Sequence, residues 1–308
     1  ADLRDLPSAR HAAEPVGGRM TGVGERIPHA APAPASQLAR WVGKSGCVEA
    51  LNIERPKLVM KVHRRFVKAG AEVLFTNSGG AAPQLLRSFR MFDEAFAVSY
   101  LGAELARTVA DEAAHQVLVI GDVRLPARVP VTGFMTEDEI ESAARCLVSA
   151  QVAGGVDAVL IDVAARPAHV AAAINGARWG MTEAKQKVPL MLLLRPALHP
   201  GKFDRDQIHE DLAQAATLAA TMQVAAIGVN PGDIPETAPA LLEHVLPYWK
   251  GAVALSPAAD AITVRTLCED PLLGGRLAYL PSSSPRDLRR IIKTSLGATT
   301  LVRRRKRK

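Results

Sequence analysis

The chain has 308 residues, of which 48% are hydrophobic, and its formal net charge is +7. This length suits one large α/β domain, and the hydrophobic content is ample for its core. The longest apolar run, around Val188–Leu194, is far shorter than the roughly 20 residues that span a bilayer, so we expect no membrane span. Three scattered cysteines argue against a disulfide scaffold and favour a reducing compartment.

Residues 1–40 are rich in Pro, Ala, Gly and Arg and show no sustained period, so they are predicted to form an irregular extension with a linker around residue 30. From residue 50 onward, apolar runs of strand length alternate with stretches at helical spacing. We expect strands at 71–76, 116–121, 157–162, 188–194, 224–229, 252–256 and 277–280. We expect helices at 55–69, 93–112, 137–153, 166–178, 204–222, 235–249, 258–269 and 285–296.

This alternation predicts an α/β fold with a parallel sheet, either a barrel or an open doubly wound sheet. Thr136 and Glu139 form the pattern of a capping box at the start of the helix at 137–153. The predicted organisation is an extension at 1–40, the α/β domain at 41–300 and a basic tail at 301–308.

The basic character is concentrated in that tail. Six of the seven net charges come from consecutive cations, which leaves the rest of the chain near +1: Arg303, Arg304, Arg305, Lys306, Arg307 and Lys308. Adjacent like charges normally stay solvated until an acidic partner neutralises them. The tail is therefore interpreted as a solubility tail, as a contact for nucleic acid or another acidic surface, or as a nuclear-targeting signal.

One stretch, Glu49–Asn77, carries a recognisable order of residues: Glu-x-Leu-Asn-x-x-Arg-Pro, then His63, Ala-Gly-Ala-Glu-Val and Thr-Asn. It resembles the homocysteine-binding barrel of the homocysteine S-methyltransferase family, which includes cobalamin-dependent methionine synthase and betaine–homocysteine methyltransferase. Weaker matches follow in the family's order at Val119–Asp122, Gly155–Asp162, Ile227–Asn230 and Ser256–Ala259, with a faint echo of the family's first strand loop at Val16–Gly22. The resemblance implies a zinc-dependent (β/α)8 TIM-type barrel.

The resemblance also implies three cysteine ligands for the zinc that activates the homocysteine thiol, one after Gly-Val-Asn and two after the last strand. At those positions this chain has Pro231, Ser282 and Ser283. Proline has no side-chain donor, and neutral hydroxyls are poor zinc ligands. Cys47, Cys146 and Cys268 do not fall at strand ends and are interpreted as structural, and His63 as hydrogen-bonded within its helix. We therefore predict no metal and no other cofactor.

Polar residues remain at the expected strand ends: Thr76, Asn77, Asp122, Asp162 and Asn230. In the family, the corresponding positions line the pocket for the amino acid. Here they satisfy one another and the loops, or they keep a small-molecule pocket without the metal, or they form a rearranged catalytic site.

The predicted function is a catalytically degenerate barrel that serves as a structural or binding subunit of a larger assembly. A ribonucleoprotein is the preferred partner, because a cationic tail gains affinity by releasing phosphate counterions. The alternative is an active homocysteine S-methyltransferase with an unorthodox site. The chain opens at Ala1 rather than Met, which suits either a removed presequence or an omitted start. The expected location is a mitochondrial matrix, with the cytoplasm as the alternative.

Overall fold

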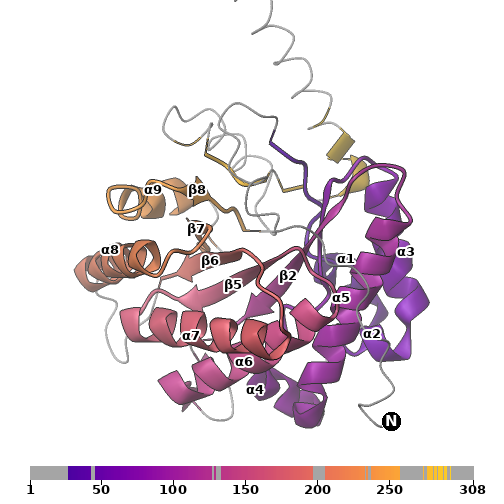
Figure 1. The fold of residues 1–308 in the computed structure, drawn as a ribbon, viewed down its shortest axis with the longest axis horizontal. Helices are drawn as coiled ribbons and strands as arrows, with labels where there is room; N and C mark the ends of the chain where they lie inside the picture. The colour runs from indigo at the N-terminus through magenta and orange to yellow at the C-terminus, as the bar shows by residue number, and fades with distance from the viewer. Residues whose placement is uncertain are drawn as a thin grey trace, which may run out of the picture.

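The computed structural model describes residues 27–42, 46–126, 128–129, 133–196, 205–232, 234, 237–256, 273, 276–279, 281–282, 284–286, 288–289 and 292. Within these residues, helices lie around the outside of a curled parallel sheet (Figure 1). None of the described helices is both long and apolar enough to cross a membrane.

The main sheet has the order β1-β2-β5-β6-β7-β8, and every pair in it is parallel. The strands that form it are β1 (Val73–Phe75), β2 (Leu118–Arg124), β5 (Ala158–Ala164), β6 (Leu190–Arg195), β7 (Ala226–Val229) and β8 (Ala252–Val253). Neighbours in the sheet follow the order of the chain, without the reversal that marks a doubly wound sheet. A short antiparallel pair, β3 (Arg128–Val129) and β4 (Gly133–Phe134), lies between β2 and the next helix.

Two further strand positions extend the sheet. Ala30 bridges to Val73 beside β1, and Leu277 bridges to Val253 beside β8, both in parallel. The Ser282 hydroxyl, just after the last strand position, donates to the carbonyl oxygen of Ala30 at the first one, at 2.8 Å. The described residues thus supply eight parallel strand positions, and the prediction of a (β/α)8 TIM-type barrel is confirmed.

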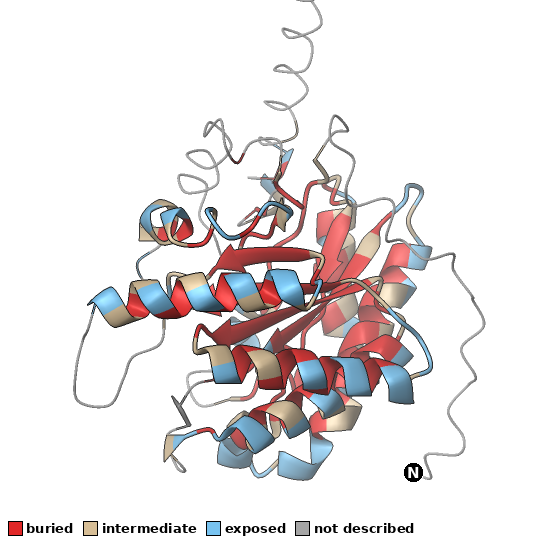
Figure 2. Ribbon diagram, turned by 60° about the vertical axis from the view of Figure 1, so that its left-hand side comes forward, coloured by how far each residue is buried: buried red, intermediate tan, exposed pale blue. Residues whose placement is uncertain are grey.

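The interior of the barrel is a packed core. Tyr279 is fully buried, its ring meets the edge of Phe75 with centroids 5.3 Å apart, and its hydroxyl donates to the Leu255 carbonyl. Figure 2 shows the strands of the main sheet buried over most of their length, whereas the helices are buried on one side and exposed on the other. A parallel sheet covered by helices requires this pattern, which is why its strands appear in the sequence as short continuous apolar runs.

The helices of the barrel cover the sheet between successive strands. The longer ones are α3 (Pro56–Val67), α5 (Ala95–Asp111), α6 (Glu137–Ala153), α7 (Pro167–Glu183) and α8 (Arg205–Thr221). The shorter ones are α1 (Ala35–Leu38), η3 (Ala39–Trp41), α2 (Leu51–Glu54), α4 (Pro83–Leu86), η4 (Arg87–Phe89), η5 (Phe92–Glu94) and α9 (Ala238–Glu243). The capping box is present, because the Thr136 side chain accepts from the Glu139 N–H and the Glu139 side chain accepts from the Thr136 N–H.

Two predictions need correction. The stretch around residue 30 is not only a linker, because Ala30 lies fully buried in the sheet. Its Ala and Pro residues lack the β-branched and aromatic side chains that signal a strand.

The helix expected at 235–249 is shorter in the structure: α9 ends at Glu243, and turns follow it. The echo at Val16–Gly22, the helix at 258–269 and the basic tail lie outside the described residues.

Candidate functional site

The carboxyl ends of the parallel strands meet at one mouth of the barrel, where barrels of this type carry their sites. Four of the polar residues singled out from the sequence lie on or just after strands β1, β2 and β5: Thr76, Asn77, Asp122 and Asp162. Asn230 directly follows β7. The register of β2 and β5 pairs Arg124 with Asp162, which brings a cation and an acid together at the mouth.

Thr76 is hydrogen-bonded to the backbone of the neighbouring strand. Its Oγ1 accepts the N–H of Asp122 at 2.9 Å, and its hydroxyl lies 2.6 Å from that of Ser78. Ser78 in turn donates to the Asp122 carbonyl at 3.0 Å. These contacts fix the end of β1 against β2, and they fix the backbone from which the Asp122 side chain extends.

Asn77 fixes the loop before α2. Its Nδ2 donates to the Val48 carbonyl and to Asn52 Oδ1, both at 3.0 Å. Asn52 Nδ2 donates back to the Asn77 carbonyl at 2.7 Å and to the Val98 carbonyl at 2.9 Å. Both amides are buried, so the Asn-containing motif at 49–56 binds α2 to the first strand and to α5.

Asp162 lies at the centre of a charged network. Its Oδ1 accepts from Arg195 Nη2 at 2.6 Å, and its Oδ2 accepts from Asn230 Nδ2 at 2.6 Å. Arg124 Nε lies 3.7 Å from the same carboxylate. Both oxygens of Asp162 therefore already have donors, and the network holds the ends of β5, β6 and β7 together.

Asp122 differs from Asp162 in one decisive respect. Its side chain is 5% exposed, and within the described residues its carboxylate accepts no hydrogen bond. Burial raises the pKa of the Asp122 carboxyl from its ordinary value of 3.8 to about 6; Arg124 opposes this, while Asp162 and Glu49 add to it. A carboxylate without donors at the mouth can take a cationic or N–H group from a ligand.

Gly79 and Gly80 let two acids approach the turn after β1. A Cβ on Gly79 would lie 2.6 Å from Asp122 Oδ2, and a Cβ on Gly80 would lie 2.6 Å from Glu49 Oε1. Glu49 Oε1 accepts the Gly80 N–H at 2.7 Å, and the Cys47 thiol donates to Glu49 Oε2 at 3.6 Å. Burial, reinforced by the Glu49 charge, raises the pKa of the Cys47 thiol to about 11, so this cysteine is protonated near neutral pH.

The resemblance places zinc ligands at Pro231, Ser282 and Ser283, and the two of these that the structure describes do not offer a thiolate. Pro231 directly follows Asn230 and has no donor, and the Ser282 hydroxyl is bonded to Ala30. Cys146 lies on α6, while Ser283 and Cys268 lie outside the described residues. In the part of the chain that the structure describes, no group of three or more His, Cys, Asp or Glu side chains could hold a metal ion.

Sequence reasoning missed three members of the mouth: Glu49, Arg124 and Arg195. Arg124 stands two residues after Asp122, a spacing that places both on one side of a strand, and Arg195 ends an apolar run. His63 is expected from the sequence to be hydrogen-bonded within its helix, but its Nε2 has no hydrogen-bond partner among the described residues, and burial lowers the pKa of this imidazole to about 4.

Comparisons with known proteins agree with this fold. A family model described as Homocysteine S-methyltransferase matches residues 22–269. Methionine synthase of Mycobacterium leprae (strain TN) is 27% identical over 242 residues, which are 78% of this chain but only 19% of that protein. The chain thus spans about a fifth of the length of the curated relatives it matches.

Crystal structures of the homocysteine methyltransferase MmuM from Escherichia coli share the fold. The oxidized form superposes with a TM-score of 0.65 at 19% identity, covering 93% of this chain and all of that one. The metallated form gives a TM-score of 0.62 at 16% identity, covering 90% of this chain and 98% of that one.

Proposed function

The chain belongs to the homocysteine S-methyltransferase family, and on that basis we propose that its barrel binds an amino-acid-like ligand at the mouth without a thiolate-bound zinc. The ligand carries an ammonium group, which Asp122 accepts, and a carboxylate, which Arg124 holds. In this proposal the chain is a binding subunit rather than a thiol methyltransferase.

The observation that carries the proposal is the difference between the two aspartates. Asp162 already receives hydrogen bonds from Arg195 and Asn230, whereas the Asp122 carboxylate receives none from the described residues. A nearly buried carboxylate that receives no hydrogen bond is costly unless a ligand or water supplies the missing donors. Arg124 is half exposed, so its guanidinium is available to a ligand carboxylate.

The donor set supports a loss of thiol chemistry. A free thiol has a pKa of about 8.5, so it is mostly protonated at neutral pH unless a metal or a cation lowers that value. Pro231 and Ser282 offer no thiolate with which to hold such a metal. The ligand is therefore bound and recognised rather than methylated at sulfur.

The larger context of the barrel stays a proposal from the sequence. The cationic tail at 303–308 attaches the subunit to a ribonucleoprotein or another acidic assembly, in a mitochondrial matrix or in the cytoplasm. Deletion of this tail is expected to remove most salt-sensitive binding, since the rest of the chain has a charge near +1. An unchanged salt dependence after the deletion would argue against this attachment.

Calorimetric titration of the full chain with amino acids, homocysteine and methionine among them, tests the mouth. We expect binding that Asp122→Asn weakens at least tenfold and that the exposed control Asp93→Asn leaves unchanged. Equal affinities in the two variants would refute the role of Asp122. In parallel, formation of a thioether product from homocysteine, with stoichiometric zinc, would establish the alternative of an active methyltransferase.

A further inference from the structure

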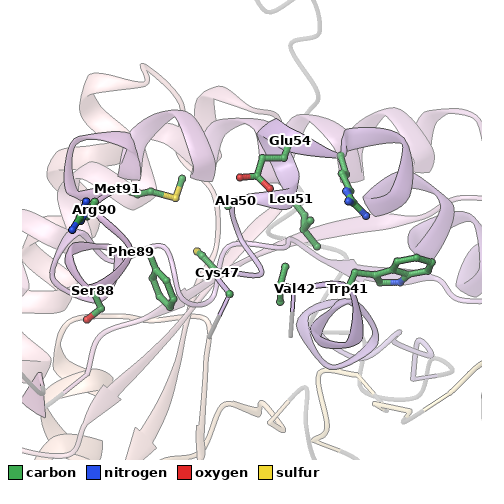
Figure 3. Close-up of a pocket in the computed structure, with 12 residues that line it drawn as sticks. Trp41, Val42, Cys47, Ala50, Leu51, Glu54, Ser88, Phe89, Arg90 and Met91 are labelled. Carbon is green, nitrogen blue, oxygen red and sulfur yellow. The ribbon is translucent and has the colours of Figure 1, made fainter. Parts of the chain in front are cut away.

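A pocket lies between η3, the start of α2 and η4. Its volume is about 470 Å³, within the range of roughly 300–1,000 Å³ that is typical of small-molecule sites. Its lining includes two aromatic rings, a thiol and three charged side chains: Trp41, Cys47, Glu54, Arg55, Phe89 and Arg90. In Figure 3, Trp41 and Phe89 lie on opposite sides of the pocket, with Cys47 and Ala50 between them.

Large apolar side chains are unusually exposed around this pocket. Trp41 is 47% exposed and Phe89 is 40% exposed, and Ile53 and Phe92 are similarly open to solvent nearby in the chain. Clusters of exposed aromatic residues mark surfaces that bind ligands or other macromolecules. Flat rings that flank a hollow favour a ligand that is itself planar, because such rings stack.

Guanidinium groups accompany these rings. Arg55 and Arg90 line the pocket and form no ion pair with any described residue. Two more arginines already lie over aromatic rings, with Arg40 5.5 Å from the Trp41 centroid and Arg87 4.7 Å from the Phe92 centroid. Arg90 has φ = 59°, a left-handed conformation that is uncommon for residues with a side chain. Unpaired guanidinium groups beside aromatic rings suit an anionic, planar partner.

Glu54 supplies the third element of recognition. It lines the same pocket and is exposed, and it makes no salt bridge within the described residues. A carboxylate offers acceptors only, so it prefers a ligand edge that presents N–H donors. Guanine presents a ring N–H and an amino group side by side, whereas adenine presents only its amino group.

We propose that this pocket binds a purine nucleotide, with the base stacked on Trp41 or Phe89, its donor edge on Glu54 and its phosphate on Arg55 and Arg90. Guanine is the preferred base. Both a free nucleotide and a nucleotide within single-stranded RNA carry this chemistry. The site uses Glu54, Arg55 and Arg90 rather than Asp122 and Arg124, so its failure and the failure of the proposed function can be distinguished.

Titration of the full chain with GMP, AMP and inorganic phosphate, followed by tryptophan fluorescence and calorimetry, tests the proposal. We expect GMP to bind more tightly than AMP and to quench fluorescence in the Trp179→Phe control but not in Trp41→Phe. The double variant Arg55→Ala/Arg90→Ala should bind GMP at least tenfold more weakly, and Glu54→Gln should reduce the preference for GMP over AMP. The matched control Arg205→Ala, on α8 at the far side of the barrel (Figure 1), should bind as the parent chain does.

A single-stranded RNA oligomer distinguishes the two sources. RNA as the ligand requires tighter binding of the oligomer than of GMP, with the same loss in Arg55→Ala/Arg90→Ala. A free nucleotide requires that this double variant change GMP affinity and leave oligomer affinity unaltered. Absence of GMP binding at millimolar concentration, or an equal loss in Arg205→Ala, overturns the proposal.

Discussion

Ser282 and Ala30 are 252 residues apart in the chain, yet the serine hydroxyl donates to the alanine carbonyl at 2.8 Å. This bond joins the last strand position of the barrel to the first. The hydroxyl occupies a position at which the family resemblance places a zinc ligand, and here it serves closure of the barrel instead.

Removal of this hydroxyl should weaken the barrel. Ser282 is 2% exposed, so Ser282→Ala leaves the Ala30 carbonyl without its donor, and we expect the free energy of unfolding to fall by about 1 kcal/mol. Urea denaturation measures it. The exposed Ser88→Ala is the control, and its free energy of unfolding should stay within about 0.5 kcal/mol of that of the parent chain. Equal free energies of unfolding in the two variants would show that the Ser282 hydroxyl does not stabilise the barrel.

Neutralising the buried acid of the charged network should cost more. Asp162→Asn keeps the shape of the side chain but presents an N–H group to Arg195 or Asn230, both of which already donate. We expect the free energy of unfolding to fall by about 2 kcal/mol, less than for a fully buried ion pair because a quarter of the Arg195 side chain is exposed. Asp111→Asn, whose carboxylate is largely exposed in its pair with Arg107, should change stability little. A loss in Asp111→Asn as large as in Asp162→Asn would contradict this account.

Asp122 should impose a pH dependence of the opposite kind from a salt-bridged acid. Burial raises the pKa of its carboxyl to about 6, so the folded chain holds this proton more tightly than the unfolded chain does. The stability that this bound proton contributes is fully present below pH 3.8 and is lost as pH rises through 6. One pKa unit is worth about 1.4 kcal/mol, so Asp122→Asn should raise the free energy of unfolding by about 3 kcal/mol at pH 7.5.

The same variant should confer almost no gain at pH 4, where Asp122 is protonated in the fold. Denaturation of the parent chain and of Asp122→Asn at both pH values isolates this contribution, because the other titrating groups are common to the two proteins. A constant difference between them across this range would show that Asp122 keeps an ordinary pKa. Binding of an ammonium ligand at the mouth should likewise strengthen as pH rises through 6.

His63 should make the chain sensitive to acid. Burial lowers the pKa of its imidazole from 6.5 to about 4, so the unfolded chain binds this proton more tightly. The stability that neutral His63 contributes is fully present above pH 6.5 and is lost as pH falls through 4. At pH 5 the loss is already roughly 2 kcal/mol. His63→Leu should lose less stability than the parent chain between pH 7.5 and pH 5, as measured by urea denaturation. Parallel losses in the two proteins would mean that His63 does not titrate in this range.

The sequence predicts the central strands of this barrel far better than the place where its first and last strand positions meet. The runs at 116–121, 157–162, 188–194 and 224–229 predict β2, β5, β6 and β7, because buried parallel strands are continuous apolar segments between helices. Ala30 has no such signal, since its strand position is fixed by pairing with Val73 and by the Ser282 hydroxyl, both distant in the chain.

At the mouth, residue types indicate which side chains are polar but not which of them are already bonded. Asp122 and Asp162 look alike in the sequence, each following an apolar run. Only the fold shows that Arg195 and Asn230 converge on Asp162, while Gly79 packs against an Asp122 carboxylate that has no such donors among the described residues.

We propose that this member of the family keeps a ligand-binding mouth without the thiolates that hold zinc. The most direct measurement is the zinc content of the purified full chain, after growth with added zinc and extensive dialysis. We predict far less than one zinc per chain. One zinc per chain, retained through dialysis, would contradict the account.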